Sequence, residues 1–131
     1  EMTLGIDVMQ ILQRGRGPST DFLLERAPLR LLAETMAAMA NSDGGTILLG
    51  VSPVDAQVRG LHDIAEARDR VLKAALLCEP PLIIPLPKVV SLDKVQVLLT
   101  EIPPGLPHVY SVKGKYLTRV GVRNQPLSPQ L

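Results

Sequence analysis

The chain has 131 residues, enough for one domain with a single core, and its 46% of hydrophobic residues exclude an intrinsically disordered protein. The formal charge of +1 excludes a polycation, and the lone cysteine, Cys78, excludes an internal disulfide and a multi-thiolate metal site. No apolar run approaches the ~20 residues of a membrane span, so we expect no membrane partner and a reducing, cytoplasmic setting.

The N-terminal region predicts a helix followed by a strand. Apolar residues at helical spacing indicate a short amphipathic helix over 6–14, with Ile6, Met9 and Leu12 on its buried side. A glycine- and proline-containing turn follows, and a short apolar strand is expected over 22–24.

Two further helices and a buried strand are expected in the middle of the chain. A tightly packed helix is predicted over 28–41, with its methionine stripe in the core. The continuously apolar run 46–51 is typical of a central strand covered on both faces. Asp63 is placed to cap a helix over 64–78.

The rest of the chain predicts strands. A strand over 83–90 carries Pro85 and Pro87, which confine it to a sheet edge because proline cannot donate to a ladder. A strand over 95–102 follows, and then a hairpin whose turn is Lys113-Gly114-Lys115 and whose strands are 108–112 and 116–120.

This order of elements predicts an α+β fold, a compact two-layer sandwich with one mixed β-sheet and two main helices. No internal linker divides the chain, so we expect a single domain over 1–131, excised from a longer protein. Its core is expected over about 7–124, with a frayed C-terminal tail over 125–131.

Adjacent glycines, Gly44 and Gly45, lie between the helix over 28–41 and the strand over 46–51. A phosphate-binding glycine loop leads from a strand into a helix, because the free N–H groups and the positive dipole lie at the helix start. Here the order is reversed, so we interpret the glycines as a helix cap and a turn, not as a nucleotide site.

The block AMAN-SDGGTILLGV, together with VRGL at 58–61, PHVY at 107–110 and RVG at 119–121, resembles the Schlafen-associated AlbA-like domain, formerly called divergent AAA. The resemblance extends from Asp7 to Asn124. Its structural motif positions in this chain are Asn41, Gly44, Gly45, Gly50, Tyr116 and Gly121.

The resemblance implies an AlbA-like fold, related to a small archaeal chromatin protein, and a nucleic-acid-binding module of bacterial transcriptional-regulator-like proteins. Arg16 departs from the family, whose members often carry a glutamate in that turn. Some vertebrate relatives cleave RNA through clustered carboxylates, but that cluster does not map residue by residue onto this sequence.

The charge pattern gives a candidate nucleic-acid interface. Glu101 is the last acidic residue, so the C-terminal part of the chain is locally basic. We expect the cations to grip the phosphates of duplex DNA, helped by a homodimer that doubles the available charge. The candidate residues are Lys113, Lys115, Arg119 and Arg123, joined by Arg14 and Arg16.

No catalytic or metal site is expected, and no cofactor. His62 and His108 lack metal-ligand spacing. Asp21 and Glu25 would lie ~13 Å apart along a strand, so we expect two solvated carboxylates. The alternative function is a protein-interaction or oligomerisation module without nucleic-acid binding. ATP binding and a Schlafen-like ribonuclease activity are less favoured, because the sequence contains neither a phosphate-binding motif nor a placeable carboxylate cluster.

Overall fold

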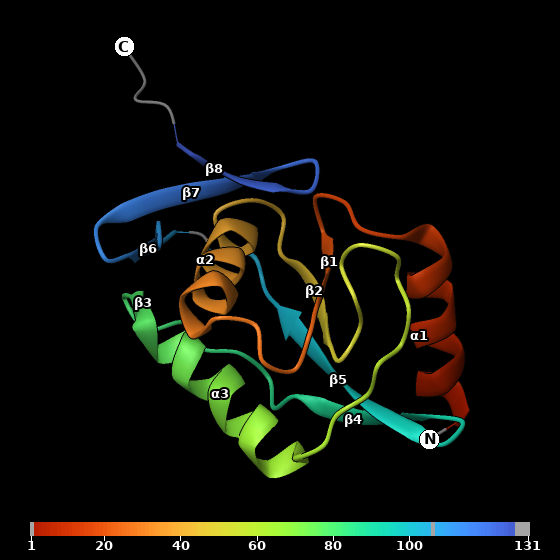
Figure 1. Ribbon diagram of the computed structural model, residues 1–131. Coiled ribbons are helices and arrows are strands. Elements are labelled where there is room, and N and C mark those ends of the chain that lie inside the picture. Colours follow the sequence, from red (N-terminus) through yellow and green to blue (C-terminus); the bar gives the residue numbers. More distant parts are fainter. Residues whose placement is uncertain (1, 106, 128–131) are drawn as a thin grey trace.

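The computed structural model describes residues 2–105 and 107–127, with side chains from residue 7 onward (Figure 1). Three helices and eight strands make up the described part of the chain. In order they are α1 (Met2–Arg14), β1 (Thr20–Leu23), α2 (Leu29–Ala40), β2 (Gly45–Leu49), α3 (Ile64–Leu77), β3 (Cys78–Glu79), β4 (Lys88–Leu92), β5 (Val95–Ile102), β6 (Ser111–Val112), β7 (Lys115–Val120) and β8 (Arg123–Pro126).

The strands form two four-stranded sheets. The first sheet has the order β1-β2-β5-β4 and is mixed, because β1 runs parallel to β2 whereas the other neighbours are antiparallel. The second sheet is antiparallel, with the order β3-β6-β7-β8. Helix α1 lies on one side of the first sheet, α2 and α3 lie on the other, and α2 also packs against the second sheet (Figure 1).

Strand β2 explains why the first sheet needs helices on both faces. Its side chains alternate, so Ile47 and Leu49 enter the core beside α2 and α3, whereas Leu48 enters the core beside α1. All three side chains are buried. The predicted burial of this strand on both faces is therefore confirmed.

The α+β class is confirmed, but the predicted two-layer sandwich with one sheet and two main helices is wrong. Three helices and two sheets are present, since the hairpin of β6 and β7 pairs with β3 and β8 rather than with the first sheet. Strand β3 has two residues, and β8 is the polar segment Arg-Asn-Gln-Pro, so neither carries an apolar alternation that would predict it.

The strand boundaries near prolines also differ from the prediction. The edge strand β4 is confirmed as an edge, but it begins after Pro85 and Pro87. At the C-terminus, Gln125 and Pro126 belong to β8, although the sequence assigned them to a frayed tail. The remainder of that predicted tail, 128–131, lies outside the described residues. Among the helices that are described, none combines the length and apolarity needed to cross a membrane.

Candidate functional site

The β6–β7 hairpin presents two exposed lysines at its tip. The predicted hairpin is present, but its first strand is Ser111–Val112 rather than 108–112, and Lys115 begins the second strand instead of belonging to the turn. Val112 pairs with Lys115, and Lys113 and Gly114 form a two-residue turn between them. Both turn residues have positive φ, +50° at Lys113 and +79° at Gly114, as in a type I′ turn. Asparagine or glycine is the usual choice at the first of these positions, so a lysine there is conformationally costly.

The hairpin is fixed to the end of α2 by the side chain of Asn41. Its Nδ2 donates to the carbonyl oxygens of Tyr110 and Leu117, both at 2.8 Å, and its Oδ1 accepts from the Tyr110 amide at 2.7 Å. Ser42 adds a second link, because its Oγ lies 2.8 Å from Thr118 Oγ1. Asn41, a predicted motif residue, therefore sets the position of the basic tip.

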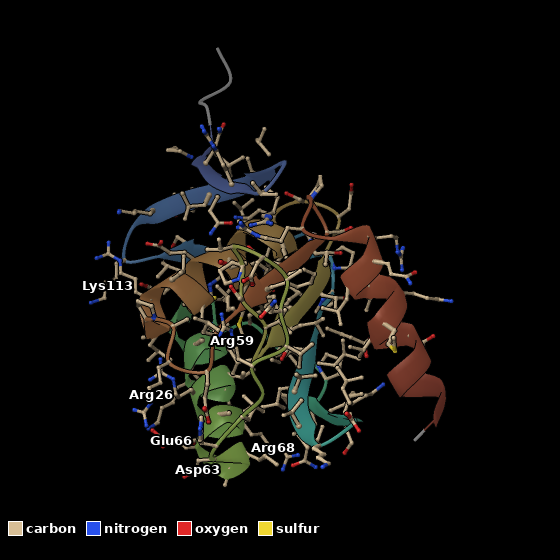
Figure 2. All side chains as sticks on the ribbon, turned by 45° about the vertical axis from the view of Figure 1, so that its right-hand side comes forward. Arg26, Arg59, Asp63, Glu66, Arg68 and Lys113 are labelled. Atoms are coloured by element: carbon tan, nitrogen blue, oxygen red, sulfur yellow. The ribbon has the colours of Figure 1, made fainter. Side chains whose placement is uncertain are left out.

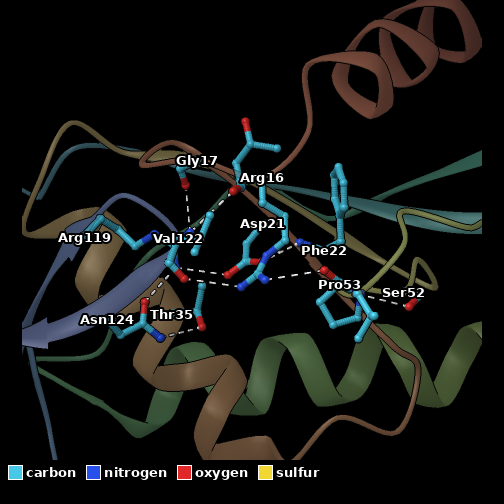
Figure 3. Close-up of polar contacts among 12 residues, drawn as sticks. Arg16, Gly17, Asp21, Phe22, Thr35, Ser52, Pro53, Arg119, Val122 and Asn124 are labelled. Atoms are coloured by element: carbon cyan, nitrogen blue, oxygen red, sulfur yellow. Dashed lines mark hydrogen bonds and ion pairs between the residues drawn. The ribbon is translucent and has the colours of Figure 1, made fainter.

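Arg119 does not belong to the exposed interface, and this part of the prediction is wrong. Its side chain is fully buried, and Nη1 donates to Asp21 Oδ2 at 3.0 Å and to Asn124 Oδ1 at 2.8 Å (Figure 3). Its Nη2 donates to the Gly17 carbonyl at 2.8 Å. Burial lowers the pKa of Arg119, although the Asp21 carboxylate acts in the opposite direction. Arg119 therefore connects β7 to Asp21, Asn124 and Gly17, and its guanidinium is not free to contact a phosphate.

Arg16 shares the same carboxylate. Its Nε donates to Asp21 Oδ1 at 2.7 Å, and its Nη atoms reach the carbonyl oxygens of Pro53 and Val122 at 3.4 and 3.3 Å (Figure 3). The Phe22 amide also donates to Asp21 Oδ1, at 2.8 Å. The cluster of Asp21, Arg16 and Arg119 thus satisfies polar groups along the outer edge of β1 and joins it to the β7–β8 turn.

The remaining predicted cations lie away from the hairpin tip. Arg14 ends α1 and is exposed. Arg123 begins β8 opposite Val120 and is also exposed. Lys115 and Val120 are the two ends of β7, which are ~17 Å apart at about 3.4 Å per residue. The cations that the sequence grouped into one candidate interface therefore form two groups, with the buried Arg119 between them.

Asp21 and Glu25 are not the solvated pair that the sequence suggested. Asp21 is buried, whereas Glu25 accepts the backbone N–H groups of His62 and Asp63 at the start of α3, each at 2.9 Å. Burial acts to raise the pKa of Glu25, but these hydrogen bonds and the His62 ring outweigh it and hold the pKa below its ordinary value. Each carboxylate is engaged by its own partners.

The glycine pair has the turning role expected from its place in the chain. Gly44 has φ +80°, and a Cβ there would lie 2.5 Å from the Ile102 carbonyl oxygen, so only glycine fits. Its amide donates to the Met39 carbonyl at 2.8 Å, closing the end of α2. This N–H group is therefore engaged within the protein. Of the other motif glycines, Gly50 follows β2 and Gly121 lies in the β7–β8 turn.

Cys78 and Tyr116, whose side chains could take part in a reaction, occupy structural positions in the fold. Cys78 is buried, and this burial raises the pKa of its thiol to about 11, which leaves it protonated and unreactive at neutral pH. Tyr116 is half-exposed on β7 and its carbonyl accepts from Leu127. Over 2–105 and 107–127, no group of three or more His, Cys, Asp or Glu residues is arranged to hold a metal ion.

A cavity of about 850 Å³ lies beside the charged cluster. Its wall includes Arg16 and Asp21 on one side, Thr35 of α2 on another, and Arg123 with Asn124 from β8. Asn124 Nδ2 donates to Thr35 Oγ1 at 3.0 Å, so α2 and β8 are joined by two residues of the cavity lining (Figure 3). Sequence reasoning did not identify this cavity, because its lining comes from segments far apart in the chain.

The sequence matches the family model described as Schlafen, AlbA_2 over residues 15–128. Two solved structures are similar. The N-terminal domain of a protein related to the ATP-dependent DNA helicase RecG, from Nitrosomonas europaea, has a TM-score of 0.65 and 17% identity, covering 97% of this chain and 91% of that one.

The DIP2311 protein from Corynebacterium diphtheriae has a TM-score of 0.64 and 19% identity over 84% of this chain. The match covers 22% of DIP2311, so this chain spans about a fifth of that protein's length. At these identities the two likenesses establish the fold. No curated protein matches the sequence.

Proposed function

The chain belongs to the Schlafen AlbA_2 family, and from that premise we propose that it binds nucleic acid, specifically duplex DNA, as a module of a bacterial transcriptional-regulator-like protein. The similar domain from Nitrosomonas europaea is the N-terminal part of a protein related to a DNA helicase, which supports a role on DNA.

The observation that carries the proposal is the pair of lysines at the hairpin tip. Lys113 and Lys115 are exposed, and neither forms an ion pair within the described residues. Figure 2 shows Lys113 at the outer edge of the molecule, at the turn between β6 and β7. The sequence after Glu101 contains no carboxylate side chain that could neutralise them locally. These are the properties of side chains that contact phosphate.

The binding mode that follows is electrostatic. Lys113 and Lys115 contact the phosphate backbone of the duplex, and the exposed Arg14 and Arg123 add contacts further along it. The half-buried Arg16, which is paired with Asp21, adds a further contact. A phosphate contact has the same chemistry at every base pair, so the binding is weakly sequence-selective and sensitive to salt. A homodimer would bring two hairpins to one duplex.

Charge reversal at the hairpin tip tests this proposal. We expect Lys113→Glu/Lys115→Glu to weaken binding to a blunt DNA duplex at least tenfold, about 1.4 kcal/mol, in fluorescence anisotropy at low salt. The matched control is Arg26→Glu/Arg68→Glu, which makes the same change in net charge beside α3 (Figure 2). Equal losses for the two double variants would mean that net charge alone matters, and the hairpin would have no special role.

A second candidate function, a protein-interaction or self-association module, is favoured by unusually exposed aliphatic side chains. Val54, Ile83 and Leu86 are 92%, 85% and 73% exposed. Contiguous exposed apolar surface marks sites that a protein partner covers, and Ile83 and Leu86 lie close together in one exposed segment before β4. If the double lysine variant bound DNA as well as the wild type, and sedimentation gave a stable dimer, this second function would replace the first.

A further inference from the structure

The cavity beside the charged cluster continues into a second cavity next to the hairpin. This second cavity has a volume of about 530 Å³ and is lined by Lys115, Tyr116 and Leu127 on the ribbon of β7 and β8. Glu34 and Asn124 line both cavities, so the two meet there. Because they share these residues, we treat the two cavities as one groove along the β7–β8 ribbon, with Lys115 in the lining at one end and Arg16 at the other.

Cations stand at the two ends of this groove. Lys115 lies at the hairpin end, and Arg16 and Arg123 lie at the other, separated by the ~17 Å length of β7. The carboxylate of Glu34 between them is paired with Arg30 at 3.1 Å, and Asp21 is paired with two arginines. The acidic groups of the groove are thus neutralised, whereas Lys115 and Arg123 form no ion pair within the described part of the chain.

Between the cations the groove offers apolar surface. Tyr116 is 51% exposed at the hairpin end, and Val122 and Val54 are exposed at the other end. Only 2% of the residues in the chain are aromatic, so an exposed aromatic ring distinguishes this part of the surface. A tyrosine ring of this kind provides a face on which a base can stack.

A duplex does not use such a groove, because its bases are paired and stacked inside and it presents mainly phosphates to the apolar walls. A single strand offers both phosphates for the cations and free base faces for the apolar surfaces. The side chain of Gln125 adds a polar group that can reach base edges, whereas the Asn124 amide is already engaged by Thr35 and Arg119.

We propose that this groove holds a short single-stranded segment of nucleic acid, with phosphates at Lys115 and Arg123 and one base stacked on Tyr116. The proposal rests on the nucleic-acid binding proposed above and adds a preference for a junction between duplex and single strand. Neighbouring phosphates of one strand lie ~3.4 Å apart along the axis even in the fully stacked duplex, so an unpaired tail of about five nucleotides is long enough to span the ~17 Å groove.

The experiment compares three DNA ligands by fluorescence anisotropy at one salt concentration. They are a blunt duplex, the same duplex with a tail of about five thymidines, and the same duplex with an abasic tail of equal length. The abasic tail has the same phosphates but lacks bases, so it separates stacking from charge. We expect the thymidine tail to bind the wild type about fivefold or more tightly than the abasic tail, because only the thymidine tail has a base that can stack on the tyrosine ring.

Three variants test the residues. Tyr116→Leu is expected to remove the preference for the thymidine tail and to leave blunt-duplex affinity unchanged, whereas Tyr116→Phe, which retains the ring, keeps the preference. Arg123→Ala is expected to weaken binding of both tails, and Arg26→Ala, an exposed arginine outside the groove, to weaken neither.

The outcomes separate the two proposals. Equal affinities of the wild type for thymidine and abasic tails would overturn the groove proposal, as would a thymidine preference that survives in Tyr116→Leu. In either case, duplex binding that still depends on Lys113 and Lys115 would leave the proposed function standing. Absence of binding to all three ligands would overturn both.

Discussion

Individual residues of this domain differ in how far the sequence reveals their roles. Asn41 and Gly44 stand in a recognisable block, and the structure places both at the end of α2, where they cap the helix and hold the hairpin. The sequence predicts Arg119 as an exposed cation, but its side chain is buried. Its partner Asp21 lies 98 positions earlier in the chain, and no local pattern signals a pairing over that separation.

Asp21 provides a direct test of the buried cluster. We expect Asp21→Asn to reduce the free energy of unfolding by about 3–5 kcal/mol, because it leaves the buried Arg119 guanidinium without its counter-charge. Urea denaturation followed by circular dichroism measures this change. The control Asp43→Asn, at an exposed carboxylate, should change stability by less than about 0.5 kcal/mol.

A double variant identifies the cause of that loss. Asp21→Asn/Arg119→Met removes both charges, so it should recover part of the stability lost in the single variant. If Asp21→Asn were as stable as the Asp43→Asn control, the cluster would not be the link between β1 and the second sheet that we infer.

The helices and strands with strong periodicity were predictable, whereas short or polar ones were not. Strand β2 and the Asp63-capped helix α3 follow from apolar runs and a capping residue. Strand β8 has no such signal. In α1 the helical period is correct and Leu12 packs against the core as expected, but Met9 is 57% exposed and Val8 is buried in its place. Which side of a short helix faces the core depends on the sheet beneath it, which the sequence alone does not fix.

Glu25, in the segment after β1, accepts hydrogen bonds from the start of α3. We expect the contribution of this contact to the free energy of unfolding to depend on pH. The folded-state pKa of Glu25 lies below its ordinary value of 4.5, so the ionised form stabilises the fold. This contribution is fully present above pH 4.5 and is lost as the pH falls through the lower folded-state pKa. Glu25→Gln should therefore cost about 1–2 kcal/mol at pH 7 and progressively less under acidic conditions.

The measurement is the unfolding free energy of the wild type and of Glu25→Gln across this pH range. Asp69→Asn is the control, because Asp69 forms only an exposed pair with Lys73 and should contribute little at any pH. A difference between wild type and Glu25→Gln that stayed constant down to the most acidic pH would contradict the role given to the carboxylate.

For the molecule as a whole, the sequence predicted the α+β class and the family, but not the division into two sheets. Helix α2 packs against both sheets, and the second sheet carries the basic tip and one wall of the groove. That arrangement separates the cations that the sequence grouped together, because β7 places Lys115 at one end and Arg123 near the other. The spatial pattern of charge depends on strand pairing, which no local sequence pattern encodes for β8.

The proposal that the hairpin tip binds DNA phosphates makes one residue informative in two ways. Lys113 has positive φ, a conformation that asparagine adopts at lower cost. Lys113→Asn should therefore raise the unfolding free energy by about 0.5–1 kcal/mol while it removes a phosphate contact. A lysine in this costly conformation is what a binding role at the hairpin tip predicts.

The decisive measurement is the affinity of wild type and Lys113→Asn for a blunt DNA duplex over a series of salt concentrations. If the lysine contacts a phosphate, the slope of log K against log salt should become shallower by about 0.9 in the variant, while its thermal stability stays equal or rises. An unchanged slope in a folded Lys113→Asn protein would contradict the proposal, because Lys113 would then release no counterion on binding.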